Sequence, residues 1–136
     1  MVEVLPDVTV HRMRHYRKNR LLQMMQEFDI PTLLIYDPVS IRYATDSRNV
    51  QVYALNHECR YLFMAADGTT ELFDWVAGHD AYHGHLDTID AVHVARPVGF
   101  MSDGVDNFDT SLHAWADQIE SLIRRTSPDD LRVGID

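Results

Sequence analysis

One short segment determines where a helix must give way to a strand. Pro31 has no backbone donor and disfavours helix in the residue before it, so a helix that enters this segment has to end near Asp29. The next run, residues 32–36, is apolar and short, which predicts a buried strand that Asp37 and Pro38 terminate. A helix joined to a buried strand by such a tight connection predicts layered α/β packing.

Helical periodicity occurs near both ends of the chain. One apolar stripe comprises Leu21, Met24 or Met25, and Phe28, and the other comprises Leu112, Trp115, Ile119 and Leu122. Spacings of three and four residues are typical of amphipathic helices, so we expect a helix over residues 9–27 and a second long, packed helix around the later stripe. Asn107 or Asp109 is placed to cap the second helix, and residues 126–130 should end it.

A β-hairpin is the strongest local prediction. Residues 60–65 and 70–74 flank a turn that contains Asp67 and Gly68, and an Asp-Gly pair supplies the positive φ that tight hairpins need. We expect further strands over residues 89–94 and 131–135, a weak helix after the hairpin, and a surface loop over residues 96–107. The element order predicts an α/β fold with a mixed sheet of five or six strands and helices packed against its faces.

Composition narrows the classes of function. With 136 residues, the chain is long enough for one domain with a single core. Its formal net charge of −9 disfavours nucleic acid and anionic membrane surfaces as partners. The single cysteine, Cys59, excludes an internal disulfide, and the first thirty residues lack the apolar run of a signal peptide or membrane span. These features predict a cytoplasmic protein.

The segment that begins at Phe28 and runs through Pro38 into Ile41-Arg42-Tyr43 resembles a known pattern. It is similar to the start of the amino-terminal domain in the creatinase, prolidase and aminopeptidase P family. The resemblance implies that residues 1–136 form this α/β domain, which is often compared to ribonuclease H in topology. It also implies that a catalytic domain of the pita-bread type follows Asp136, so that the present chain is inactive alone and has that domain as its partner.

The resemblance carries expectations about chemistry and assembly. In the metallopeptidases of the family, two Asp, one His and two Glu of the pita-bread domain hold a pair of divalent metal ions, such as manganese, cobalt or zinc, so we expect no cofactor in this chain. The parent reaction stays open between an Xaa-Pro dipeptidase or aminopeptidase, a creatinase-like hydrolase, and the dimethylsulfoniopropionate lyase on the same scaffold. The family also implies a homodimer, with this domain at the dimer contact.

The polar segment over residues 45–53 is the first candidate for a functional site. In creatinase-like dimers, the corresponding residues of one subunit overhang the substrate pocket of the other. A guanidinium there offers a charged fork to a substrate carboxylate, and aromatic rings exclude water. We therefore expect Arg48, then Tyr53 and Trp75, at the rim of the pocket. In the structural alternative, Arg42 or Arg48 pairs with Asp46 and Tyr53 fills a sheet face.

A second hypothesis concerns a histidine-rich segment. His79, His83 and His85 lie close in sequence to Asp80 and Asp87, and all of these side chains are competent zinc ligands. The alternative function is thus a self-contained module that binds a metal or small ligand through this cluster, while the plainer interpretation is a solvated helix edge. Because the chain contains no GxSxG, P-loop or dinucleotide fingerprint, we assign no catalytic residue.

Overall fold

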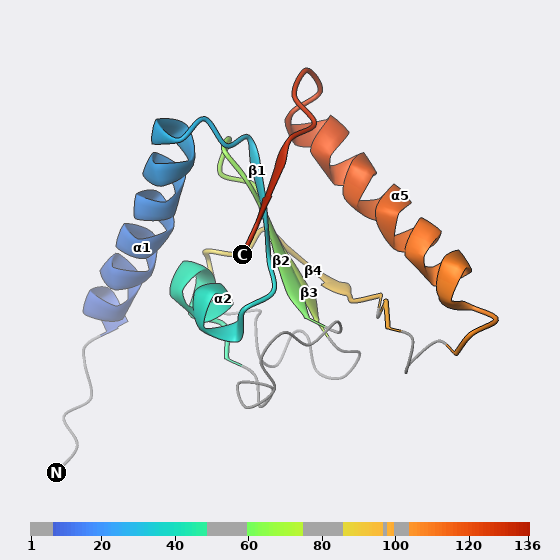
Figure 1. Ribbon diagram of the computed structural model, residues 1–136. Coiled ribbons are helices and arrows are strands. Elements are labelled where there is room, and N and C mark those ends of the chain that lie inside the picture. Colours follow the sequence, from blue (N-terminus) through green and yellow to red (C-terminus); the bar gives the residue numbers. More distant parts are fainter. Residues whose placement is uncertain (1–6, 49–59, 75–85, 97, 100–103) are drawn as a thin grey trace, which may run out of the picture.

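The structure is a computed structural model that describes residues 7–48, 60–74, 86–96, 98–99 and 104–136. Its elements, in chain order, are α1 (Asp7–Glu27), β1 (Thr32–Ile35), α2 (Pro38–Thr45), β2 (Tyr61–Ala65), β3 (Thr70–Asp74), β4 (Ala91–Val94), α5 (Phe108–Thr126) and β5 (Val133–Ile135). Figure 1 shows their arrangement. Within the described part, no helix has the length and apolar character that crossing a bilayer requires.

The described strands form one mixed five-stranded sheet in the order β4-β3-β2-β1-β5, which confirms the predicted α/β class. Strand β2 runs antiparallel to both β1 and β3, whereas β4 is parallel to β3 and β5 is parallel to β1. Four strands therefore share one direction. Their carboxyl ends lie at the same edge of the sheet, and β2 begins at that edge.

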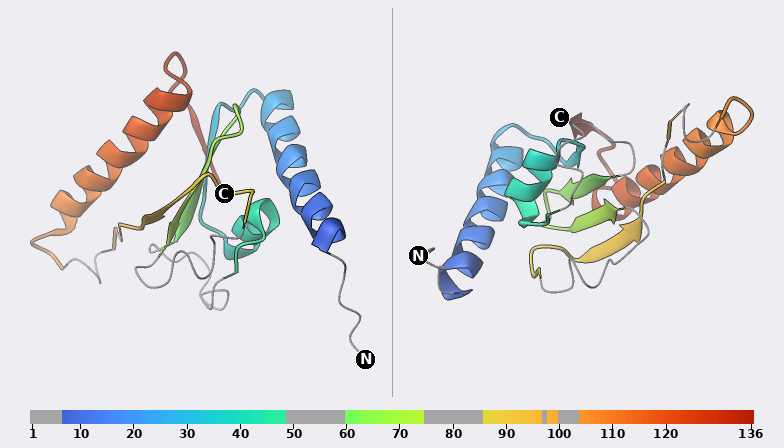
Figure 2. Two further views of the ribbon diagram at one scale, coloured as in Figure 1. Left: turned by 180° about the vertical axis from the view of Figure 1, so that it is seen from behind. Right: turned by 90° about the horizontal axis from the view of Figure 1, so that it is seen from below.

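Helices cover both faces of the sheet, with α1 and α2 on one side and α5 on the other (Figures 1 and 2). Successive side chains along a strand point to opposite faces of the sheet, so each face has its own apolar surface for helices to cover. In β2, Tyr61, Phe63 and Ala65 pack in the cluster that includes Ile119 of α5, while Leu62 packs with the α2 side chains. Both β2 and β3 are buried along their whole length. Strand β2 accordingly has a continuous apolar sequence, whereas β3 also buries the polar residues Thr70, Glu71 and Asp74.

The hairpin has the predicted turn. Gly68 has a φ of 100°, and its amide donates to the carbonyl of Ala65 at 2.9 Å. The Thr69 amide donates to Asp67 Oδ1 at 2.8 Å, so the side chain of the turn residue replaces a backbone acceptor. The tight turn sets the register in which Tyr61 lies opposite Phe73.

Helix α1 ends where Pro31 requires. Asp29 adopts the left-handed region with a φ of 53°, and the Ile30 amide donates to the carbonyl of Met25 at 2.8 Å. Phe28 follows the last residue of α1 and lies in this closing turn, and its side chain is 67% exposed rather than packed against the sheet as the stripe predicted. Leu112 also differs from the prediction, since it is exposed near the end of α5 that Figure 1 shows lying away from the sheet.

Helix α2 is an element that the sequence analysis did not predict. Its eight residues span about two turns, which is too short for a periodicity argument. Local chemistry starts it instead, because Asp37 occupies the N-cap and Pro38 the first helical turn. By contrast, the weak helix expected after the hairpin and the cysteine at position 59 lie outside the described residues.

We expect Asp37→Ala to destabilise the fold by about 1 kcal/mol, because the carboxylate accepts from the Ser40 amide at 2.7 Å and from the Ser40 hydroxyl at 2.8 Å. These bonds, the hydroxyl first, lower the pKa of Asp37. The stabilisation is therefore present above the ordinary carboxyl pKa of about 4 and is lost as the pH falls through the lower folded value. Urea unfolding at neutral and acidic pH measures both effects.

Asp37→Asn serves as the matched control for this cap. Asparagine keeps an acceptor for the Ser40 amide but cannot titrate, so its stability at neutral pH should stay near that of the parent chain. If Asp37→Ala and the parent chain unfold at the same urea concentration at neutral pH, the cap does not stabilise α2.

Candidate functional site

Polar residues gather where α2 ends, beside the sheet edge at which β2 begins and β3 finishes. Arg60 directly precedes β2 and Asp74 is the last residue of β3, so the hairpin places them opposite each other. In open α/β sheets, ligands bind outside the carboxyl ends of the strands. We call residues 45–48, which leave α2 at this edge, the rim segment.

A buried ion pair between Arg60 and Asp74 contacts the rim segment. Arg60 and Asp74 are each only 3% exposed, and Arg60 Nε donates to Asp74 Oδ2 at 3.1 Å. A second guanidinium nitrogen, Nη2, donates to Ser47 Oγ at 2.5 Å. The pKa of Arg60 is lowered from its ordinary value, because the effect of burial exceeds the opposing effect of the Asp74 charge. Because the guanidinium of Arg60 donates to both Asp74 of β3 and Ser47 of the rim segment, it fixes the position of the rim segment relative to β3.

Asp46 turns the chain out of α2. It adopts the left-handed region with a φ of 65°, and its amide donates to the carbonyl of Arg42 at 2.8 Å. Its carboxylate accepts from Arg14 Nε at 3.0 Å and lies 3.7 Å from Arg17 Nη1. The described partners of the Asp46 carboxylate thus come from α1, and not from the guanidinium of Arg42 or Arg48 that the structural alternative proposed.

Hydroxyl groups hold the remaining backbone of the rim segment. Thr45 Oγ1 donates to the carbonyl of Ile41 at 2.7 Å and accepts from the Ser47 amide at 3.1 Å. Thr88, from the turn that precedes β4, donates to the carbonyl of Thr45 at 2.7 Å. All three of these hydroxyl residues are fully buried. The chain is therefore anchored up to the residue before Arg48.

Of the three residues predicted to contact substrate, the structure describes Arg48 alone. Arg48 follows Ser47 directly and is exposed, so its guanidinium is accessible from outside the domain. Tyr53 and Trp75 lie outside the described residues, as do His79, His83 and His85 of the second hypothesis. The residue before Arg48, Ser47, accepts from the buried Arg60, and Arg60 and its partner Asp74 were not among the residues predicted from the sequence.

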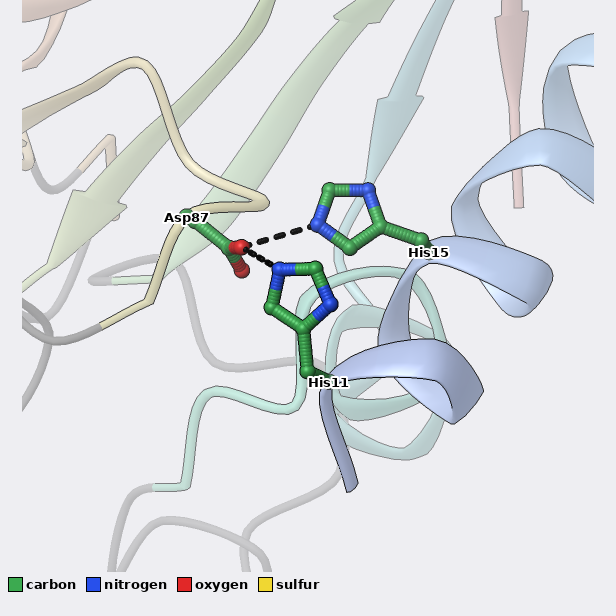
Figure 3. Close-up of side chains that lie close together, drawn as sticks. All are labelled: His11, His15 and Asp87. Atoms are coloured by element: carbon green, nitrogen blue, oxygen red, sulfur yellow. Dashed lines mark hydrogen bonds and ion pairs between the residues drawn. The ribbon is translucent and has the colours of Figure 1, made fainter. Parts of the chain in front are cut away.

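A second polar cluster joins α1 to the turn before β4. His11 Nε2 and His15 Nε2 lie 2.5 and 2.8 Å from the same oxygen, Oδ2 of Asp87 (Figure 3). The hydrogen bond from His15 is the main cause that lowers the pKa of Asp87, and the charges of both imidazoles add to it. Asp87 was among the ligands predicted from the sequence, whereas His11 and His15 were not. Their spacing of four residues on a predicted helix was the available signal.

Curated proteins similar to this chain share nearly all of its length. It is 31% identical over 135 residues to the dimethylsulfoniopropionate lyase DddP of Roseovarius nubinhibens and 28% identical over 132 residues to that of Roseobacter denitrificans. In both cases the match covers 97% of this chain but only 29% of the relative. No family model matches the chain.

The fold also occurs in a solved structure. The crystal structure of an Xaa-Pro aminopeptidase from Streptococcus pyogenes superimposes with a TM-score of 0.53, covering 91% of this chain and 92% of the solved chain. At 13% identity, this likeness shows the fold and does not address the substrate.

Proposed function

Because this chain is an amino-terminal domain of the creatinase, prolidase and aminopeptidase P family, we propose that it is a non-catalytic part of a longer enzyme. The observation that carries the proposal is the unequal coverage, since 97% of this chain matches only 29% of the lyase from Roseovarius nubinhibens. In the longer enzyme, the domain forms part of the dimer contact and of the rim of the substrate pocket, and the enzyme works in the cytoplasm.

For the parent reaction, sequence similarity favours a lyase that acts on dimethylsulfoniopropionate or a related zwitterion. The two lyases are 31% and 28% identical to this chain, whereas the aminopeptidase is 13% identical. Dimethylsulfoniopropionate carries a carboxylate at one end and a sulfonium cation at the other. An arginine at the rim suits the carboxylate, because its planar fork donates two parallel hydrogen bonds.

Arg48 is the residue that we propose for this contact. It is exposed, and the three residues before it are buried, with hydrogen bonds to α2, to Arg60 and to the turn before β4. A rigid support reduces the entropy that a guanidinium loses when it binds an anion. The domain would therefore act by positioning substrate, while bond cleavage takes place on the catalytic domain.

The test starts from the coding sequence beyond Asp136. We expect it to continue into a pita-bread domain, and the longer protein should cleave dimethylsulfoniopropionate while the 136-residue chain alone should not. In that protein, Arg48→Ala should lower kcat/KM at least about tenfold, because a charge-assisted hydrogen bond contributes roughly 1.5–3 kcal/mol. Steady-state kinetics measures the loss.

Arg124→Ala is the matched control, since Arg124 is an exposed arginine on α5 paired only locally with Glu120 in the described part of the chain. Its kcat/KM should stay within error of the parent enzyme. Equal kinetics for Arg48→Ala and Arg124→Ala would remove Arg48 from the pocket. Cleavage of Xaa-Pro dipeptides instead of dimethylsulfoniopropionate would overturn the lyase assignment but keep the domain assignment.

A further inference from the structure

We propose that His11, His15 and Asp87 form a binding site for a divalent transition-metal ion, with zinc as the best match. This site is separate from the rim segment and does not depend on the proposed function. It also differs from the histidine-rich segment over residues 79–85, because two of its three donors come from α1.

Three potential metal-donor atoms lie close together in the folded chain. His11 and His15 lie one helical turn apart on α1, and their ring centroids are 4.4 Å apart. Figure 3 shows both rings directed at Asp87, which approaches from the turn before β4. One donor atom from each of the three residues lies within 4.8 Å of the other two. Asp87 lies 72 positions after His15, so the cluster forms only when the chain folds.

The donor set is one that zinc prefers. Two imidazole nitrogens and one carboxylate oxygen supply three protein ligands, and an open fourth position accepts water or another ligand. Imidazole donors favour zinc, copper and nickel over calcium and magnesium, which take oxygen ligands. In a tetrahedral site with bonds of about 2.0–2.1 Å, the donor atoms are about 3.3 Å apart. The present distances of 2.5 and 2.8 Å to Asp87 need to open by less than about 1 Å.

The surroundings hold Asp87 while leaving the cluster open to solvent. Thr88, the next residue, is fully buried and donates to the carbonyl of Thr45 at 2.7 Å. Lys18 from α1 donates to the carbonyl of Thr88 at 3.1 Å, and this fixes the turn against the same helix that carries both histidines. The side chains of His11 and Asp87 are 57% and 43% exposed, so an ion can enter without unfolding.

A bound ion would tie α1 to the turn before β4. In its absence, each imidazole must donate an Nε2 proton to the same oxygen of Asp87. A bound metal ion would take the place of the proton on each Nε2, which moves to Nδ1 of a neutral ring or to solvent from a charged one, and three coordinate bonds would then join the two segments. Because the folded chain assembles the donors and the unfolded chain does not, the metal should raise the melting temperature in a concentration-dependent way.

Calorimetric titration of the chelator-treated 136-residue chain with zinc chloride tests the proposal. We expect saturable binding of one ion. His15→Gln and Asp87→Asn should each weaken the affinity at least about tenfold, because even the outer partners of metal ligands contribute tenfold or more. Titration with cobalt should give the absorption of a tetrahedral site in the parent chain, and this absorption should be lost in both variants.

Two histidine variants serve as matched controls. His113→Gln removes an exposed histidine on α5, and His83→Gln removes one from the histidine-rich segment. Both should bind zinc as the parent chain does. No heat of binding in the parent chain, unchanged affinity in His15→Gln, or loss of affinity in His83→Gln would each overturn the proposal. Circular dichroism tests whether each variant remains folded.

Discussion

Asp74→Ala should destabilise the fold by about 3–5 kcal/mol, because it leaves the guanidinium of Arg60 buried without the carboxylate that balances its charge. Folded domains are stable by only about 5–15 kcal/mol, so the variant should lie near its unfolding threshold at room temperature. Chemical unfolding followed by far-UV circular dichroism measures the loss. We also expect a looser rim segment, since Arg60 bonds Ser47 as well.

The double variant Arg60→Met with Asp74→Leu separates charge from packing. Two apolar residues of similar volume remove both charges together, and such replacements are often neutral or stabilising. Most of the loss seen in Asp74→Ala should therefore be recovered. Glu120→Ala provides the exposed counterpart, because its pair with Arg124 spans one helical turn in solvent and should contribute less than about 1 kcal/mol. A loss below 1 kcal/mol for Asp74→Ala would contradict the argument.

The pairing of Arg60 with Asp74 could have been derived from the sequence. The predicted turn around Asp67 and Gly68 sets the register of the hairpin, and that register places the residue before Tyr61 opposite the residue after Phe73. Charges of opposite sign at facing positions then predict an ion pair. Only its burial required the structure, because burial depends on tertiary contacts such as the one between Arg60 and Ser47.

The other contacts were not derivable, because they join segments through tertiary packing. Asp46 binds arginines of α1 that lie 32 and 29 positions earlier, and Asp87 lies 72 positions after His15. A pattern in one segment does not report which distant segment packs beside it. Strand order also depends on tertiary packing, since the last described strand, β5, pairs with β1 at the opposite edge of the sheet from β4. Local signals were reliable where proline, glycine or helical spacing restricts the backbone directly.

Phe73→Ala should also destabilise the fold by about 3–5 kcal/mol, and its effect comes from a cavity and not from charge. Phe73 is 1% exposed and lies between two other rings, with centroid distances of 4.6 Å to Tyr61 and 4.8 Å to His93. The ring of Tyr36 extends this row, with its centroid 5.4 Å from that of Tyr61. The row of rings therefore runs from the end of β1 across β2 and β3 to β4, on the face of the sheet that α5 covers.

Removing the ring at position 73 interrupts this row at a site where the rigid sheet cannot close the gap. Phe73→Leu keeps most of the volume and should cost less than about 1.5 kcal/mol, which makes it the matched control. Urea unfolding compares the two variants, and near-UV circular dichroism should lose intensity in both, because the rings couple to each other. A similar loss of stability for alanine and leucine would mean that ring stacking, and not filled volume, gives Phe73 its contribution, since only leucine fills the space while neither residue stacks.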